Sequence, residues 1–400
     1  MRRNAEKVKM LIVFGTRPEA IKLAPVIREA RRRPWANPVT CVTAQHREML
    51  DQMLRAFGIR PEIDLGVMTR GQSLHSLTSR MLMRLQKVMR EQRPHLIVVQ
   101  GDTTTTFVSS LAAFYERIPI AHVEAGLRTW NKHEPFPEEM NRKLADSLAD
   151  FHFAATKDNR RNLIKEGCDP RRVFVVGNTV VDALHYIVKS NRMRSTFPDI
   201  PPLGPRKKII VVTAHRRESF GEPLRNICKA LQQISHLRDD IEIVYPVHLN
   251  PNVLKPVRKL LGGNPRIHLL PPLDYLTFIE LLRRSFFILT DSGGIQEEAP
   301  SLRKPAIVMR DVTERPEGVR AGFVKVVGTR MEAIVDAAKH LLNDASAARR
   351  LKNTPNPYGD GHSARRILTI IGEHQTSLQA RTRLHSPRLH SKYRREGASS

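Results

Sequence analysis

Short apolar runs recur along the whole chain, and most are followed by a polar or glycine-containing turn and then by an amphipathic segment. These runs lack the strict alternation of half-exposed strands, so they indicate strands that helices bury on both faces. Repeated strand–helix units are typical of α/β proteins with parallel sheets. Twelve segments fit this description: "VKMLIVF", "VTCVT", "HLIVVQ", "IPIAHV", "FHFAA", "VFVVG", "KKIIVVTAH", "IEIVYPVH", "RIHLL", "SFFILT", "PAIVM" and "FVKVV".

Twelve strands are too many for one ordinary open sheet, and the pattern is interrupted by "KSNRMRSTFPDIPPLGPRKK", which is rich in proline, serine and charge. We therefore predict two Rossmann-like domains, residues 8–190 and 207–360, joined by a linker at residues 191–206. A ligand is expected in a cleft between them, beyond the carboxyl ends of the strands. The basic residues 1–7 are interpreted as an extension, and the polar, basic residues 376–400 as a disordered tail.

Charge, the length of apolar runs and cysteine usage narrow the function classes. The 400 residues include 66 Lys and Arg against 40 Asp and Glu, and much of the net charge of +26 lies near the two ends. The sequence has neither an aromatic-rich basic stripe nor zinc-finger spacing, so a solvated basic surface is favoured over a specific nucleic-acid site. No apolar run approaches the roughly 20 residues that span a bilayer, the first run is too short for a secretory signal, and the three cysteines are scattered. We expect a cytoplasmic protein with reduced thiols and no membrane insertion.

Two glycine-containing turns follow predicted strands and precede predicted helices. In "VFGTRPEAIKLAP", Gly15 permits a tight turn, and Arg17 and Lys22 lie near the next helix start, where they could meet an anion. In "FFILTDSGGIQEEAPSL", Gly293 and Gly294 would let the backbone approach a phosphate at a helix N-terminus. Surface charge at a loop and a plain glycine-rich connection are the alternative interpretations. Neither motif is a Walker loop or a full G-x-G-x-x-G, so glycine spacing alone indicates no cofactor.

Three further residues extend the anion-binding interpretation. Ser292 precedes the two glycines, and Glu298 lies one helical turn further on, where a carboxylate could accept hydrogen bonds from ribose hydroxyls. His215 follows the first strand of the second half, in "VVTAHRRESFGEP", with Arg216 beside it. A histidine in this position can also be structural. Together, the turns after the first strand of each half fit a nucleotide diphosphate.

Three carboxylates follow strands or open a helix in the first half. Asp102 ends "HLIVVQGD", Glu124 ends "IPIAHVE", and Glu138 follows "HEPFP" at a predicted helix start. Because successive strands often lie side by side, we expect Asp102 and Glu124 close together, with Glu138 on a segment that folds over them. Close carboxylates have different pKa values, so that one can be an acid while another is a base. Helix N-terminal charge is the alternative interpretation of Glu138 and Glu139, and no His/Cys cluster or Asp-x-Asp pair indicates a metal.

These motifs, in this order, closely resemble those of the bacterial non-hydrolysing UDP-N-acetylglucosamine 2-epimerases. The resemblance covers roughly residues 8–375 and rests on the segments "FGTRPEAIK", "TAQHREMLDQ", "GDTTTT", "HVEAGLRT", "PFPEEMNR", "GNTVVDAL", "HRRES", "YPVHLNP", "LTDSGGIQEEAPSL", "RDVTERPEG" and "NPYGDG". It implies a GT-B fold, with two Rossmann-like parallel-sheet domains, the active site in the cleft between them, and a C-terminal helix at residues 361–375 that returns to the first domain. It also implies a homodimer that needs no metal or nicotinamide cofactor and supplies ManNAc for surface polysaccharide.

The resemblance also implies a mechanism. UDP is eliminated from UDP-N-acetylglucosamine (UDP-GlcNAc) to give 2-acetamidoglucal, and it adds back after a proton returns to the opposite face of carbon 2, which gives UDP-N-acetylmannosamine (UDP-ManNAc). The residues that match the family's catalytic set are Asp102, Glu124, Glu138 and His215, the last supporting the diphosphate. Those that match its UDP contacts are Arg17, Lys22, Leu273, Phe278, Ser292, Gly293, Gly294, Glu298 and Arg315. Those that match a second, activating UDP-GlcNAc site of some members are Gln45, Arg216 and His248, and Glu48 stands at a position of that site where some members carry glutamine.

Three other functions stay open on the sequence alone. A retaining GT-B glycosyltransferase would use the same nucleotide site but transfer the sugar to an acceptor. A 2-epimerase for a modified sugar, such as a diacetamido uronic acid, would share the mechanism. A nucleic-acid-binding protein would use the basic ends of the chain.

Overall fold

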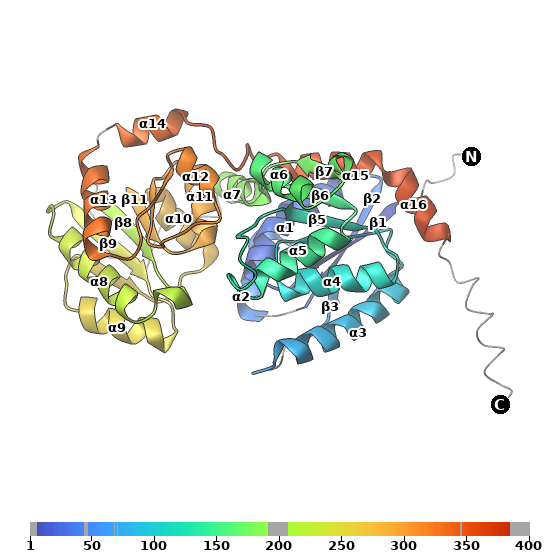
Figure 1. Cartoon of the computed structure of the whole chain (residues 1–400), viewed down its shortest axis with the longest axis horizontal. Coiled ribbons are helices and arrows are strands. Elements are labelled where there is room, and N and C mark those ends of the chain that lie inside the picture. The colour runs from blue at the N-terminus through green and yellow to red at the C-terminus, as the bar shows by residue number, and fades with distance from the viewer. Residues whose placement is uncertain are drawn as a thin grey trace. The chain divides into compact units, whose positions relative to one another are not determined.

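The chain is organised as two α/β units, whose elements are labelled in Figure 1. The computed structural model describes residues 6–43, 47–67, 69, 71–190, 207–344 and 346–384. The N-terminal unit comprises Met1–Ala183 and Gly361–Ser400, and the C-terminal unit comprises Leu184–Asp360. The first boundary falls inside helix α7 (Thr179–Lys189), before the predicted limit at residue 190. The predicted linker, residues 191–206, lies outside the described residues.

The N-terminal unit is built on a seven-stranded parallel sheet with the order β3-β2-β1-β4-β5-β6-β7. The chain first builds outward from β1 to β3 and then crosses back to β4, and ligands of such sheets bind near this reversal, at the carboxyl ends of the strands. The strands are β1 (Val8–Phe14), β2 (Ala36–Val42), β3 (Ile63–Asp64), β4 (Leu96–Gln100), β5 (Ile120–Ala125), β6 (Phe151–Ala154) and β7 (Val173–Val175). The helices are α1 (Arg17–Arg32), α2 (Arg47–Phe57), α3 (Leu74–Gln92), α4 (Thr104–Tyr115), α5 (Glu138–Leu148), α6 (Lys157–Lys165), the 3-10 turn η1 (Pro170–Arg172), α15 (Ser363–Glu373) and α16 (Gln375–Leu384).

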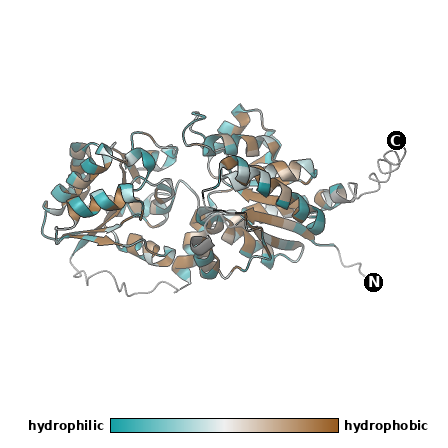
Figure 2. Cartoon of the chain, turned by 90° about the horizontal axis from the view of Figure 1, so that it is seen from below, coloured by the Kyte–Doolittle hydropathy of each residue, from teal (hydrophilic) through white to brown (hydrophobic). Residues whose placement is uncertain are grey.

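The central strands of this sheet are buried. Every residue of β4 is buried, and in β1 only Lys9 is partly exposed. Figure 2 shows these strands mostly brown, and the helices around them brown on one side and teal on the other. Helices that cover a sheet with one apolar side produce the unbroken apolar runs seen in the sequence.

The C-terminal unit has a six-stranded parallel sheet with the order β10-β9-β8-β11-β12-β13. Its strands are β8 (Lys208–Thr213), β9 (Ile241–Pro246), β10 (Ile267–Leu270), β11 (Phe287–Thr290), β12 (Ala306–Val308) and β13 (Val324–Val326). Its helices are α8 (Glu222–Ser235), α9 (Pro251–Leu261), α10 (Tyr275–Arg284), α11 (Gly293–Ser301), α12 (Pro316–Arg320), α13 (Met331–Asn343) and α14 (Ala347–Asn353), with the 3-10 turn η2 (Arg217–Ser219). In the described part of the chain, no helix is both long and apolar enough to cross a membrane.

All twelve predicted strands are present, and the prediction of an α/β protein with parallel sheets is confirmed. One further strand, β3, was not predicted. It has two residues, Ile63 and Asp64, and within the described part of the chain it pairs with the end of β2 alone. An edge strand of this length leaves no apolar run in the sequence.

Helix α15 belongs to the N-terminal unit and is joined to the first part of the chain by Asp182. The Asp182 carboxylate accepts the amide hydrogens of Ser363 (3.2 Å) and Ala364 (2.9 Å). These amides open the helix and would otherwise lack an intrahelical partner. Ile367 and Leu368 of α15 are fully buried, and the helix lies against α1. The N-terminal unit is therefore assembled from two separate parts of the chain.

The prediction of a disordered tail at residues 376–400 is wrong for its first part, because Gln375–Leu384 forms helix α16. Leu378 is 2% exposed, and the Arg381 guanidinium lies 3.1 Å from the Asp150 carboxylate. One buried leucine and one ion pair anchor a segment that is otherwise polar, so its mean hydropathy did not reveal the helix. The rest of the predicted tail lies outside the described residues.

Candidate active site

The turn between β1 and α1 is fixed by Glu19 and by a glycine. The Glu19 carboxylate accepts the amide hydrogens of Gly15 (3.0 Å) and Thr16 (2.8 Å) through one oxygen. Its other oxygen accepts the hydroxyl hydrogen of Thr103 (2.7 Å), from the turn after β4. Burial raises the pKa of Glu19, although these hydrogen bonds act in the opposite direction. A side chain at Gly15 does not fit, because its Cβ would lie 2.0 Å from the Thr43 hydroxyl oxygen.

Lys22 and Glu124 form a largely buried ion pair at the end of β5. The Lys22 Nζ and Glu124 Oε2 atoms are 2.5 Å apart, and both side chains are 10% exposed. The Asn178 side-chain amide donates to the same oxygen at 3.0 Å. The structure thus brings together one residue predicted to contact the diphosphate and one predicted to move protons. Arg17, the first residue of the same helix as Lys22, is half-buried.

Glu124 lies on an irregular part of β5. The register between β5 and β6 shifts between Val123 and Ala125, and the φ of Glu124 is 66°, in the left-handed region. A non-glycine residue in that region costs on the order of 1–3 kcal/mol and persists only where its surroundings hold it. Bulges of this kind redirect side chains beside active sites. A strained backbone therefore presents Glu124.

Asp102 follows β4 and lies at the same edge of the sheet as Glu124. The ladder between β4 and β5 continues to the Gly101 amide, which donates to the Val123 carbonyl at 3.0 Å. The Asp102 carboxylate is paired with the guanidinium of Arg142. Both predicted acids are therefore held by a buried cation, at the ends of adjacent strands.

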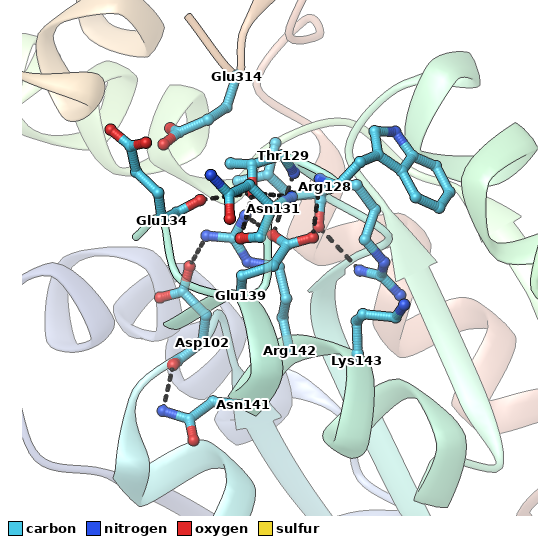
Figure 3. Close-up of polar contacts among 12 residues, drawn as sticks. Asp102, Arg128, Thr129, Asn131, Glu134, Glu139, Asn141, Arg142, Lys143 and Glu314 are labelled. Atoms are coloured by element: carbon cyan, nitrogen blue, oxygen red, sulfur yellow. Dashed lines mark hydrogen bonds and ion pairs between the residues drawn. The ribbon is translucent and has the colours of Figure 1, made fainter. Parts of the chain in front are cut away.

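Helix α5 supplies the partners of Asp102. Figure 3 shows Arg142 between Asp102 and Glu139, and the Asn141 side chain donates to the Asp102 carbonyl at 3.0 Å. Glu139 is buried, lies 3.0 Å from Arg142, and also accepts two amide hydrogens of the preceding loop. Glu139 thus has a structural role. Glu138, the first residue of α5, is half-buried next to it.

In the C-terminal unit, Asp291 fixes the turn that follows β8. Asp291 is fully buried after β11, and β11 is the neighbour of β8. Its Oδ2 atom accepts the amide hydrogens of His215 and Arg216, both at 2.8 Å. The same oxygen accepts the hydroxyl hydrogen of Ser219 at 3.0 Å. The two anion-binding turns predicted for the second half therefore meet at one edge of this sheet.

The His215 ring stacks on the ring of His248, with 5.5 Å between the centroids and 14° between the planes. Burial lowers the pKa of His215, and nearby His248 and Arg216 lower it further, although Asp291 acts in the opposite direction. Together these effects favour the uncharged form of the ring. A neutral imidazole can donate a hydrogen bond to a phosphate oxygen.

Helix α11 begins at Gly293, directly after Ser292. A Cβ at Gly293 would lie 2.7 Å from Nη1 of Arg315, so the glycine lets the guanidinium pack against the helix start. The Arg315 Nε–H donates to Glu297 at 2.6 Å and is held in place. A Cβ at Gly294 would meet nothing closer than 3.9 Å. The free amides and the dipole of a helix N-terminus favour an anion such as a phosphate, whereas the charge of Arg315 is already paired with Glu297 and Glu314.

The remaining predicted UDP contacts lie on or near α10 and α11. Glu298 is 7% exposed and accepts the hydroxyl hydrogen of Tyr275 at 3.1 Å. Phe278 on α10 and Leu273 before it are half-buried. The residues predicted to contact the base, the ribose and part of the diphosphate thus belong to one unit.

Comparison with known proteins identifies the family of the chain. A family model described as UDP-N-acetylglucosamine 2-epimerase matches residues 28–372. The chain is 50% identical over 376 residues to the UDP-N-acetylglucosamine 2-epimerase of Escherichia coli K12, which covers 93% of this chain and 100% of that protein. It is 49% identical over 363 residues to the UDP-N-acetylglucosamine 2-epimerase of Bacillus subtilis 168, and this match covers 91% of this chain and 94% of that protein. The chain belongs to the UDP-N-acetylglucosamine 2-epimerase family.

Solved structures of this epimerase family share the fold. The UDP-GlcNAc 2-epimerase of Neisseria meningitidis, solved bound to UDP-GlcNAc, has a TM-score of 0.86 and 45% identity, and covers 91% of this chain and 100% of that chain. The enzyme of Methanocaldococcus jannaschii, solved with UDP-GlcNAc and UDP, has a TM-score of 0.77 and 33% identity, with 91% and 99% covered. A glycotransferase of kitacinnamycin, at 12% identity and a TM-score of 0.62, shares the fold alone. The predicted family and the predicted GT-B type of fold are confirmed.

Four residues of the epimerase chain were predicted to form a second, activating site. Gln45 lies outside the described residues, and only the backbone of Glu48, on α2, is described. Arg216 follows His215 in the chain, and the ring of His248 stacks on the ring of His215. These two residues therefore adjoin a predicted diphosphate ligand. Among the described residues, no group of three or more His, Cys, Asp or Glu side chains could hold a metal ion.

The sequence analysis did not identify four residues that bond to predicted site residues or to the turns that carry them. They are Glu19, Arg142, Asn178 and Asp291. Each lies within a segment that carries the family resemblance, and membership of these segments was the only sign in the sequence that the four residues matter for the site. Arg142 binds Asp102 across 40 positions of sequence, and Asp291 binds His215 across 76. No local pattern reports such long-range bonds.

Proposed function

We propose that this epimerase interconverts UDP-GlcNAc and UDP-ManNAc by reversible elimination and re-addition of UDP. The observation that carries the proposal is the pair of carboxylates, Asp102 and Glu124, at adjacent strand ends, each held by a buried cation. This pair occurs in a chain that is about half identical to UDP-N-acetylglucosamine 2-epimerases over most of its length.

In the proposed reaction, the C2–H bond and the bond between C1 and the UDP oxygen break. A carboxylate takes the proton, the C–H electron pair forms the C1=C2 double bond of 2-acetamidoglucal, and the electron pair of the C1–O bond leaves with UDP. A proton then returns to the opposite face of C2, and UDP attacks C1. The cycle is redox-neutral and consumes no co-reactant. Asp102, Glu124 and Glu138 are proposed as the acid–base groups for the two faces.

The C-terminal unit is proposed to hold the nucleotide. The amides at the start of α11, from Ser292 to Gly294, would bind the diphosphate with the support of the helix dipole. Neutral His215 would donate a hydrogen bond to it, and Glu298 would accept from the ribose hydroxyls. Phe278 and the Leu273 backbone would contact uracil.

Some proposed contacts of the diphosphate come from the N-terminal unit. Lys22 pairs with the proposed acid Glu124, and Arg17 opens the same helix; both are proposed, as the family resemblance implies, to bind the diphosphate. The enzyme is further proposed to act as a homodimer in the cytoplasm, as the family resemblance implies.

The proposal is tested by incubating purified protein with UDP-GlcNAc alone in heavy water and following the products by NMR. UDP-ManNAc should appear without an acceptor sugar or added metal, with deuterium on C2 because the returning proton comes from an exchangeable group. Turnover of a modified UDP-sugar but not of UDP-GlcNAc would instead favour the related epimerase. A strict requirement for an acceptor would favour a glycosyltransferase.

A further inference from the structure

A buried histidine–aspartate pair joins the two segments that present the proposed acids. His122 on β5 is 0% exposed and Asp146 on α5 is 2% exposed, and His122 Nδ1 lies 2.6 Å from Asp146 Oδ1. His122 Nε2 lies 2.7 Å from the carbonyl oxygen of Gly101, the residue before the first proposed acid. Asp146 Oδ2 accepts the amide hydrogen of Gly126, two residues after Glu124, at 3.2 Å. One pair of side chains therefore contacts both segments.

The contacts of Asp146 lie on both sides of the bulge in β5. His122 precedes Glu124 in the chain and Gly126 follows it, and both bond to the same carboxylate. Glu124 is in the left-handed region, with φ of 66°, and such a conformation persists only where neighbouring groups hold it. Gly126 is confined as well, because a Cβ there would lie 2.3 Å from the Asn159 carbonyl oxygen. The Asp146 carboxylate is therefore placed to keep the bulge in shape.

The bonding pattern requires His122 to be an imidazolium. Its two ring nitrogens face a carboxylate oxygen and a carbonyl oxygen, which only accept hydrogen bonds, so both nitrogens must carry hydrogen. Burial by itself lowers the pKa of His122, but the charge of Asp146 and the bonds to Asp146 and Gly101 raise it overall, against the effect of Arg128.

Further charged or titratable groups surround the pair. Arg128, after β5, donates to Asp146 Oδ2 at 2.7 Å and also binds Glu166 at the end of α6. His152 on β6 bonds to the backbone carbonyl of Asp146. Burial by itself raises the pKa of Asp146, but the charge and hydrogen bond of His122 and the charge of Arg128 lower it to about 2.

We infer that His122 and Asp146 are positioning residues, which fix the distance and direction of Asp102 and Glu124 relative to C2 of the substrate. The inference rests on the proposed function, since it assigns these acids to proton transfer. Both residues are too deeply buried to contact substrate themselves. They act through the Gly101 carbonyl on one side and the β5 bulge on the other.

The test compares His122→Gln with His152→Gln. His152 is the matched control, because it pairs with His122 across β5 and β6, is also buried, and bonds to the backbone rather than to the side chain of Asp146. In His122→Gln we expect kcat to fall about a hundredfold, the loss that a misplacement of about 1 Å can cause. The KM for UDP-GlcNAc and the affinity for UDP should stay near the wild-type values, and His152→Gln should keep wild-type kcat.

Wild-type kcat in His122→Gln, or an equal loss in both variants, would overturn the inference, because neither result fits a specific positioning role. A wild-type protein that does not convert UDP-GlcNAc would instead refute the proposed function and leave the next measurement decisive.

That measurement needs neither activity nor a variant that folds. Imidazole signals of the wild type in ¹⁵N-labelled protein should show two protonated nitrogens on His122 at about pH 8, well above the ordinary histidine pKa of about 6.5. His122→Gln and His152→Gln serve to assign the signals if they fold, and selective labelling with relaxation filtering isolates the buried ring otherwise. A neutral tautomer at that pH would overturn the inference.

Discussion

Gly293 is a position where one methyl group would be costly. Its Cβ would lie 2.7 Å from the Arg315 guanidinium, which is itself held by Glu297. We therefore predict that Gly293→Ala displaces Arg315 from the start of α11 and weakens UDP binding about tenfold or more, about 1.4 kcal/mol. Titration calorimetry with UDP measures the loss. Gly263→Ala is the control, because a Cβ there meets nothing within 4 Å; equal affinities of both variants would contradict the prediction.

The proposed acids can be tested one at a time with near-isosteric amides. Asp102→Asn, Glu124→Gln and Glu138→Gln should each lower turnover by about a hundredfold or more, because a positioned acid or base contributes about that much. UDP affinity should persist, since the proposed nucleotide contacts are mostly in the other unit. Steady-state kinetics and calorimetry separate the two effects.

Glu116→Gln is the control for these three variants, because Glu116 belongs to the same unit and pairs with Arg90 at the surface. It should leave turnover unchanged. Near-normal turnover in a variant of all three proposed acids would remove the mechanism.

Asp146 should make the stability of the N-terminal unit depend on pH in the acidic range. Its pKa of about 2 is below the ordinary value of about 3.9, so its contribution to stability is complete above about pH 4 and is lost as the pH falls through about 2. The pKa of His122 is raised, so its contribution is complete below about pH 6.5 and is lost as the pH rises through its folded-state pKa. Urea unfolding of Asp146→Asn should show a shallower loss of stability between about pH 4 and 2. An unchanged slope would contradict this assignment.

At the scale of elements, the apolar runs predicted the strands well because both sheets are buried on both faces. β4 is an example, since all five of its residues are buried and all except Gln100 are apolar. β3 was not predicted because Ile63 and Asp64 form an edge strand of only two residues. The start of α11 was predictable too, because a strand, two glycines and a helix follow one another in the chain.

The partners of the site residues were not predictable, because bonds between distant residues leave no local pattern. Glu124 meets Lys22 across 102 positions and Asn178 across 54. The bulge that presents Glu124 depends on Asp146, which lies on a different element. The motifs supplied the candidate acid–base residues, whereas the groups that bond to them became visible only in the tertiary structure.

Helix α16 should contribute to stability although its composition is polar. Leu378 is 2% exposed, so Leu378→Ala should lower the free energy of unfolding by about 2 kcal/mol, near the low end for a buried leucine. Thr376→Ala, at an exposed position of the same helix, is the control and should change little. Deletion of residues 385–400 should also leave thermal unfolding and turnover near the wild-type values. Equal unfolding free energies for the two alanine variants would show that α16 is not anchored by Leu378.

For the whole molecule, UDP should protect the two units unequally. The proposed binding site of the diphosphate is formed by the start of α11 and by the turn after β8, both in the C-terminal unit. Hydrogen exchange with and without UDP should therefore slow most at these amides. Uridine is the control ligand and should protect α11 less, because it lacks the diphosphate. Protection confined to the N-terminal unit would contradict the proposed division of roles.

The anchoring of α15 by Asp182 has a consequence for how the two units fold. The N-terminal unit needs Ser363 and the helix after it, whereas the C-terminal unit is one continuous stretch, Leu184–Asp360. Because domains fold as units, the C-terminal unit, which is proposed to bind the nucleotide, can form its core without the last segment, on which the N-terminal unit depends. A chain truncated after Asp360 should therefore bind UDP although it cannot move a proton.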